Sequence, residues 1–162
     1  MKKFLKLTFS VIVIIVVLAM FVKLIDYNSL GSKNTRYLEK NLSENVKITN
    51  GNVKDLITFD YDKMYVFESY QSIEEMERQI GFKYHKLKQG VSEGMLNILF
   101  VKDNRAIAYL YGYPSNIGYY INIQSGEYNK ADIDYMTYTV EEREVGNSSG
   151  SPRTYMHYEF IA

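Results

Sequence analysis

The sequence contains no cysteine. This absence excludes disulfide bonds, thiolate nucleophiles, cysteine-ligated zinc and iron–sulfur clusters, and it removes the processing site that a bacterial lipoprotein needs. A folded domain outside the cytoplasm would therefore have to be stable without covalent cross-links. Tryptophan is also absent, whereas 16 tyrosines bring the aromatic content to 15%. Tyrosine favours strands and partly wet surfaces, so we expect a protein rich in β-structure.

Acidic residues are missing from the first 23 positions, which contain four lysines. The 162-residue chain is formally neutral, so the remainder carries 15 basic and 19 acidic residues. An acidic remainder without basic clusters is poorly suited to a phosphate backbone, and we expect no nucleic-acid partner. The length fits one domain with a short appendage, and the apolar fraction of 46% is typical of a globular chain.

The N-terminal segment contains an uncharged run, residues 7–22, between Lys6 and Lys23. As a helix this run covers about 24 Å, and snorkelling lysines extend the usable span to Phe4–Ile25, close to the roughly 30 Å of a bilayer core. We predict that residues 1–25 are an uncleaved transmembrane anchor. A cleaved signal peptide and a buried soluble helix are the alternatives, and the lack of an A-x-A-like cleavage site favours the anchor.

The lysine distribution also predicts a membrane orientation. Three lysines precede the span, whereas Lys23 is offset by Asp26. This bias places the N-terminus in the cytoplasm and the chain beyond about residue 26 outside it. We expect residues 26–34, which are rich in Asn, Ser and Gly, to be a linker, and residues 35–162 to be an extracytoplasmic domain at the cell membrane.

The stretch TFDYDKMYVFESY, residues 58–70, contains a strand pattern with two apolar faces. Met64 and Val66 alternate with Tyr65 and Phe67, which is typical of a central strand covered on both sides. The helix that follows has its own start and stop signals. Its sequence, SIEEMERQIG, predicts a capping box at the first residue, a glycine terminator and a buried stripe of Ile73, Met76 and Ile80.

Further strands are predicted by period-two alternation and by turn residues. Asp103–Asn104 lies between two apolar runs and predicts a hairpin, and Asn50–Gly51 predicts a turn between short elements. The pattern over residues 135–145 and 154–162 predicts two more strands. Leu38, Leu42 and Val46 recur at four-residue spacing and predict a helix within residues 34–46. We therefore predict an α+β fold in which one or two helices pack on one face of a small antiparallel sheet.

Asp60 and Asp62 are candidate metal ligands, because residues i and i+2 of a strand point to the same side. Asp132 and Asp134 form a second such pair, and His157 could join them. The alternative is that these aspartates are polar residues at the entrance of strands, and the missing glycine of a calcium loop favours it. The sequence contains no Walker loop, no G-x-G-x-x-G, no G-x-S-x-G and no S-x-x-K motif, so we expect no cofactor.

Tyrosines on one face of a sheet are the other candidate site. Such a face can bind a protein or glycan because tyrosine offers contact area at low entropic cost. The alternative is cross-strand pairing that only stabilises the sheet. The candidate binding residues are Tyr109, Tyr111, Tyr113, Tyr138 and Tyr158.

The segment from Phe59 to Phe67 reads FDYDKMYVF, and a capped helix and a hairpin with a charged turn follow it. In this order it resembles small, uncharacterised envelope proteins of low-GC Gram-positive bacteria, which carry an F-D-[WY]-D-K-x-Y-x-F strand. The resemblance covers about a third of the chain. It implies a bacterial source and a membrane-tethered or secreted setting, and it assigns no catalytic role.

Together these features predict a membrane-anchored extracytoplasmic binding module of the bacterial envelope, with an unidentified protein partner. An immunity-type protein that binds a toxin is one concrete form. A metal-assisted hydrolase using Asp60 and Asp62 is one alternative, and a structural accessory of a membrane complex is another. The sequence favours a protein that is not an enzyme.

Overall fold

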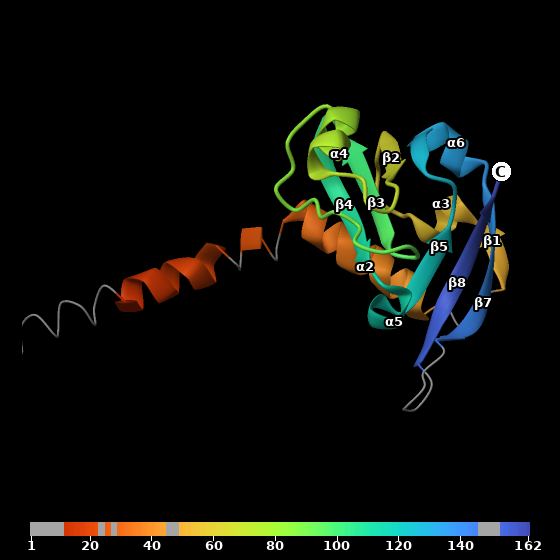
Figure 1. Cartoon of the computed structure of the whole chain (residues 1–162), viewed down its shortest axis with the longest axis horizontal. Helices are drawn as coiled ribbons and strands as arrows, with labels where there is room; N and C mark the ends of the chain where they lie inside the picture. The colour runs from red at the N-terminus through yellow and green to blue at the C-terminus, as the bar shows by residue number, and fades with distance from the viewer. Residues whose placement is uncertain (1–11, 23–24, 27–28, 45–48, 146–152) are drawn as a thin grey trace, which may run out of the picture.

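The computed structural model describes residues 12–22, 25–26, 29–44, 49–145 and 153–162. Residues 12–22 form a helix that projects from an α+β domain built of two sheets and several helices (Figure 1). The predicted α+β class is confirmed, but the chain forms two sheets rather than the single sheet predicted, and helices cover both faces of one of them rather than one face. Among the described residues, no helix has both the length and the apolar character needed to cross a bilayer. Residues 1–11 and 23–24 of the predicted anchor lie outside the described residues.

The first sheet, here the β2 sheet, is antiparallel throughout and has the strand order β4-β3-β2-β6. Its strands are β2 (Lys63–Val66), β3 (Leu96–Lys102), β4 (Arg105–Gly112) and β6 (Gly126–Asn129). Asp103 and Asn104 join β3 to β4, and both have positive φ angles, 49° and 56°. Two consecutive left-handed residues match the right-handed twist of a hairpin, so the predicted Asp-Asn turn is confirmed.

The second sheet, here the β8 sheet, has the strand order β1-β7-β8-β5. Its strands are β1 (Asn50–Asn52), β5 (Tyr119–Asn122), β7 (Thr137–Val145) and β8 (Arg153–Ile161). Strands β7 and β8 are antiparallel, as predicted, but β5 runs parallel to β8. The prediction of a purely antiparallel sheet is wrong at this edge, because β5 is separated from β8 by a long chain segment that can return in either direction.

The main core lies between the two sheets. Met64 and Val66 point into it from β2, while Tyr138, Val140 and Tyr158 point into it from the β8 sheet. Tyr65 and Phe67 occupy the opposite face of β2, in a second cluster. The predicted two-faced central strand is therefore confirmed, and each face buries its own apolar set.

Helix α4 (Ile73–Ile80) covers the outer face of the β2 sheet. The Ser72 hydroxyl accepts from the Glu75 amide, and the Glu75 carboxylate accepts from the Ser72 amide, so the predicted capping box is present. Gly81 ends the helix with φ 83°. Met76 and Ile80 are buried, but Ile73 is 39% exposed, which corrects the predicted stripe.

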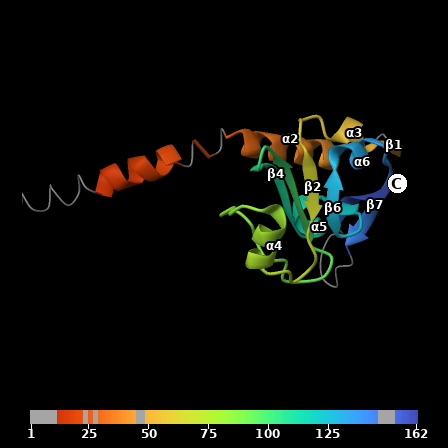
Figure 2. The same ribbon diagram turned by 90° about the horizontal axis from the view of Figure 1, so that it is seen from above.

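Helix α2 (Leu30–Glu44) lies on the other side of the β2 sheet from α4 (Figure 2). It begins at Leu30, inside the segment for which a linker was predicted, and it buries Leu38 and Leu42 in the main core. Polar side chains near its start bond to the edge of β4: the Asn34 amide donates to the Ile107 carbonyl, and the Thr35 hydroxyl accepts from the Tyr109 amide. The helix thereby covers the free backbone of an edge strand.

Three short helices were not predicted: α3 (Val53–Leu56), α5 (Pro114–Ile117) and α6 (Lys130–Asp134). The turn predicted at Asn50–Gly51 is also wrong, because these residues lie in strand β1 beside β7. A Cβ atom on Gly51 would come within 2.9 Å of the Tyr138 hydroxyl oxygen. Glycine is required here by the close approach of a tyrosine ring rather than by a turn.

Candidate binding surfaces

The structure separates the five tyrosines that the sequence grouped into one binding face. Tyr138 and Tyr158 are 3% and 0% exposed, and their rings meet 5.5 Å apart in the main core. These two predicted site residues are corrected to core residues, because the inward faces of β7 and β8 are both covered. Tyr113 is half-buried at the start of α5.

Tyr109 and Tyr111 lie on the outer face of the β2 sheet and hold the loop that follows α4. The Tyr109 hydroxyl accepts from the Lys88 amide at 3.0 Å, and the Tyr111 hydroxyl donates to the Gln89 carbonyl at 2.9 Å. The two rings stack 6.0 Å apart, and the Lys88 ammonium lies 5.3 Å from the centre of the Tyr111 ring. These phenols therefore have partners within the fold.

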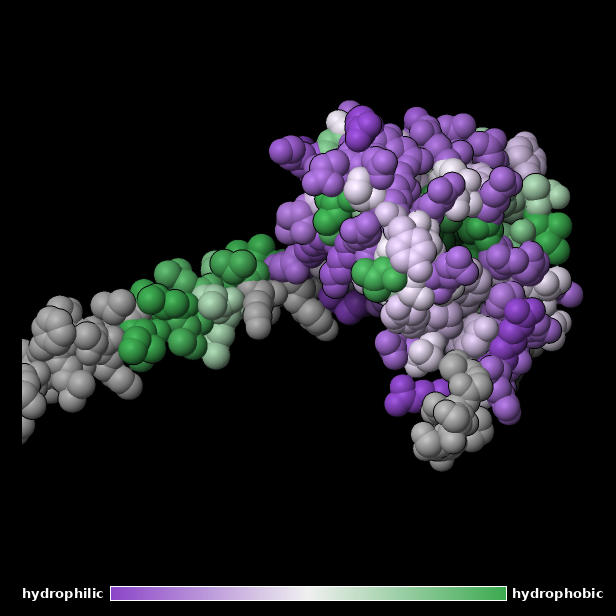
Figure 3. Space-filling model, in the orientation of Figure 1, coloured by the Kyte–Doolittle hydropathy of each residue, from purple (hydrophilic) through white to green (hydrophobic). Residues whose placement is uncertain are grey.

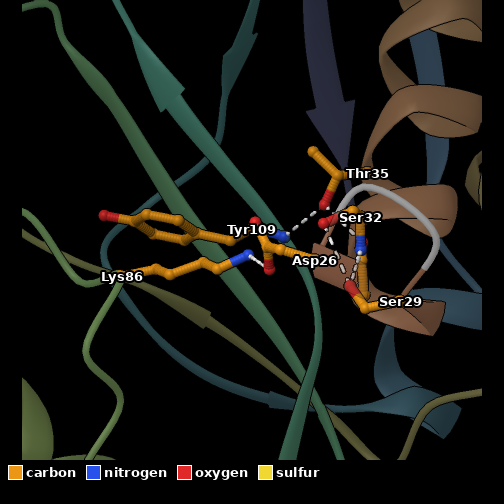
Figure 4. Close-up of polar contacts among 7 residues, drawn as sticks. Asp26, Ser29, Ser32, Thr35, Lys86 and Tyr109 are labelled. Atoms are coloured by element: carbon orange, nitrogen blue, oxygen red, sulfur yellow. Dashed lines mark hydrogen bonds and ion pairs between the residues drawn. The ribbon is translucent and has the colours of Figure 1, made fainter. Parts of the chain in front are cut away.

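A cleft of about 590 Å³ opens beside Tyr109, at the base of the N-terminal helix. Its walls come from the start of α2, from β4 and from the loop of residues 84–86. Figure 4 shows the Lys86 ammonium in contact with the Asp26 carboxylate, next to the hydrogen bonds of Ser29, Ser32 and Thr35. The fold thus brings a loop 60 residues away in sequence to the place where the chain enters the domain.

The outer face of the β8 sheet is a second candidate surface. Its residues form rows across the strands, because Tyr120 of β5 and Glu141 of β7 are both register partners of His157. Asn122 and Thr139 flank Glu159 in the next row in the same way. Residues on the outward side of β7, such as Thr139, Glu141 and Arg143, are exposed, so the described part of the chain leaves this face open to a partner.

His157 is the centre of this open face. Its imidazole stacks on Tyr120 with ring centres 5.5 Å apart, and it meets the edge of Tyr155 at 6.3 Å. The residue is 7% exposed, and its Nδ1 atom has no hydrogen-bond partner among the described residues. Burial, and then the charge of Arg143, lower the pKa of His157 below 6.5, whereas Glu159 acts in the opposite direction. A neutral imidazole between two tyrosine rings makes an apolar, aromatic centre.

Charged side chains surround that centre. The Asn122 amide donates to both carboxylate oxygens of Glu159, at 2.9 Å and 2.8 Å. The Arg143 guanidinium lies 2.5 Å from the Glu141 carboxylate. An aromatic centre with a polar, mostly acidic rim is the common anatomy of a protein–protein interface.

Asp60 and Asp62 lie at the entrance of β2 and are both exposed. Asp60 contacts the Lys102 ammonium, which lowers the pKa of Asp60 below its ordinary value. Asp62 accepts a hydrogen bond from the Asp103 amide at 2.8 Å and thereby fastens the β3–β4 turn. The structure gives each carboxylate a separate role in this hairpin, as the strand-entrance alternative predicts.

Asp132 and Asp134 stand just before a strand, β7, as predicted, but they lie in helix α6 rather than in extended backbone. Asp132 forms a capping box with Asn129, and Asp134 contacts Lys130 at 2.5 Å. Residues two apart in a helix point in different directions, so these carboxylates do not share a ligand. In the residues that the structure describes, no group of three His, Asp or Glu side chains is arranged to hold a metal ion.

Comparisons of the chain with protein-family models, with curated proteins and with solved structures found no match. The open face itself was missed by the sequence reasoning, although a signal for it was present. Alternation along β8 already placed His157 opposite Met156, Tyr158 and Phe160. Extending that parity to Tyr155 and Glu159 would have identified the outward set.

Proposed function

We propose that this protein is a single-span, membrane-anchored binding module, and that its α+β domain binds a protein partner outside the cytoplasm through the open face of the β8 sheet. The anchor is supported by the exposure of the apolar side chains of residues 12–22. Every one of these residues is exposed, and the large apolar side chains among them are between 44% and 65% exposed. Figure 3 displays this helix as a continuous hydrophobic projection beside a mainly polar domain.

A helix that is apolar on all sides requires an apolar environment. The lysines at positions 2, 3 and 6 would hold the N-terminus of the chain on the cytoplasmic side, which leaves the domain outside. Residues 4–25 are the proposed contact with the bilayer. Outside the cytoplasm the domain would depend on its two packed cores for stability, because the chain can form no disulfide.

The open face supports a protein partner of basic character. Tyr120 and Tyr155, half-buried on either side of the buried His157, offer rigid aromatic area at the centre, where interface energy concentrates. The carboxylates of Glu141 and Glu159 would steer a positively charged surface toward it. A toxin neutralised outside the membrane is one such partner, and the immunity-type function remains our concrete form of this proposal.

A photo-crosslinking amino acid at position 141 tests the binding surface in intact cells. We expect a discrete protein adduct from this position and none from Tyr135, an 88% exposed residue outside the face. Adding Glu159→Lys should remove the adduct, whereas Glu93→Lys, at an exposed site elsewhere, should retain it. An adduct that survives Glu159→Lys would count against the proposed face.

Membrane fractionation tests the anchor separately. The full chain should remain in membranes after high-salt and alkaline washing, and a chain that begins at residue 26 should not. Recovery of the full chain in the soluble fraction would refute the anchor.

The two alternatives have distinct consequences. A structural accessory of a membrane complex would keep its partners when the domain face is altered and lose them when residues 4–25 are exchanged for an unrelated span. The metal-assisted hydrolase would need a cluster of metal ligands, and the described residues contain no group of three that could hold a metal ion.

A further inference from the structure

The stretch Arg78–Ser92, both ends included, has an unusual charge composition. Four of the 15 basic residues beyond position 23 lie in it, and none of the 19 acidic residues does. Its centre, KYHKLK, is here the basic loop, residues 83–88. Lys83, His85 and Lys88 are exposed, and Lys83 has no ion-pair partner among the described residues.

The fold places the basic loop at the base of the N-terminal helix. The Lys86 ammonium contacts the carboxylate of Asp26, which follows the apolar segment directly. Helix α2 begins only four residues later, at Leu30, so at most about 14 Å of chain separates Asp26 from the domain. Tyr109 and Tyr111 fix the other end of the loop to β4 through Lys88 and Gln89. The loop is therefore held beside the anchor rather than free to move away.

We propose that the basic loop rests on anionic phospholipid headgroups and orients the domain on the membrane. This inference relies on the proposed anchor. Electrostatic attraction to an anionic bilayer acts over about 8 Å at physiological salt, and the contact of Lys86 with Asp26, directly after the apolar segment, holds the loop close to the bilayer surface. The rest of the domain is acidic, so an anionic surface repels it. A domain with one basic end and an acidic remainder turns its basic end toward the lipid.

Arg105 strengthens the same surface. It is exposed on the rim of the cleft that Lys86 and His85 also line, across from the start of α2. The open face of the β8 sheet belongs to the other sheet, so lipid contact at the loop leaves the proposed partner surface accessible. The fold thus separates a membrane-facing surface from a partner-facing surface.

The test uses the full chain in lipid nanodiscs, either zwitterionic or containing phosphatidylglycerol. Because the chain has no cysteine, a single cysteine can carry a fluorophore at position 85 or, as a control, at position 135 in the segment after α6. Figure 1 shows α6 at the end of the domain far from the N-terminal helix. A quencher attached to lipid headgroups reports how often the label touches the surface.

We expect strong quenching at position 85 in anionic discs, weaker quenching in zwitterionic discs, and little at position 135 in either. The double substitution Lys83→Gln and Lys88→Gln should reduce the ratio of surface-bound to unbound orientations about fivefold for each lysine removed. The matched pair Lys40→Gln and Lys54→Gln removes the same charge from exposed sites elsewhere and should leave the quenching unchanged.

Equal quenching in both kinds of disc, or quenching that survives loss of both loop lysines, would overturn the inference. A chain that fails to co-elute with the discs would instead refute the anchor, so the two failures are distinguishable. Quenching at position 85 that is lost when a co-purified protein binds there would assign the loop to a protein partner and would also overturn it.

Discussion

The Tyr158 hydroxyl donates a hydrogen bond of 2.9 Å to the Leu42 carbonyl, and so joins the C-terminal strand to helix α2 across 116 residues. Both residues are fully buried. Tyr158→Phe would leave that carbonyl without its partner in the core. We expect a loss of about 1–2 kcal/mol in the free energy of unfolding, measured by urea denaturation. An unchanged stability would show that water reaches the carbonyl.

Tyr61 provides the opposite case. It is 2% exposed, and its hydroxyl has no hydrogen-bond partner among the described residues. The ring packs edge-on against Phe100 at 5.3 Å, and that contact does not require the hydroxyl. Tyr61→Phe should therefore be neutral or stabilising by up to about 1 kcal/mol in the same urea experiment, since an unpaired buried polar group is removed. A marked loss of stability would show that the hydroxyl has a partner in solution.

Gly51 is predicted to be intolerant of a side chain despite its place near the edge of a sheet. The Tyr138 ring lies over it, and a Cβ atom would meet ring atoms at 3.0 Å. Gly51→Ala should cost about 1–3 kcal/mol, because either the ring or the strand must shift. Gly90→Ala is the matched control: its Cβ would find its nearest neighbour at 3.6 Å, an ordinary contact, and the loss should be much smaller.

Local features of this fold were predictable from the sequence, whereas the pairing between distant segments was not. The capping box of Ser72 and Glu75 and the Asp103–Asn104 hairpin depend on residues that are neighbours in the chain. Alternation likewise identified the two faces of β2. It could not show that the strands divide into two sheets, because the period is the same whichever strand becomes the neighbour.

The candidate site was mispredicted for the same reason. Tyr138 and Tyr158 were grouped with Tyr109 and Tyr111 on tyrosine content, but burial depends on which sheet face meets the core. The two faces of β8 carry similar residues, Tyr158 inward and Tyr155 outward. The difference between core and binding surface is thus set by a packing partner that lies more than 100 residues away.

The aspartates at the start of β2 should act on the hairpin rather than on a cation. Asp62→Ala removes the acceptor of the Asp103 amide and should lower the free energy of unfolding by about 1 kcal/mol. Millimolar calcium or magnesium should not raise the melting temperature of the unaltered protein, because a bound ion stabilises the folded state only where it has a site. A cation-dependent rise that Asp62→Ala abolishes would restore the metal hypothesis.

His157 should make stability depend on pH near neutrality. Its pKa in the fold lies below 6.5, since burial between the rings of Tyr120 and Tyr155 and the charge of Arg143 disfavour the protonated form. The unfolded chain therefore takes up the proton first as the pH falls through 6.5. The free energy of unfolding should decrease from there until the pH passes below the folded pKa of His157, and above pH 6.5 this residue should contribute no slope.

Urea unfolding between pH 5 and pH 8 measures this pH dependence directly. His157→Gln should remove the slope, whereas His85→Gln, at the exposed loop, should retain it. A slope that persists in His157→Gln would assign the pH dependence to another group and would show that the imidazole is hydrated on the open face.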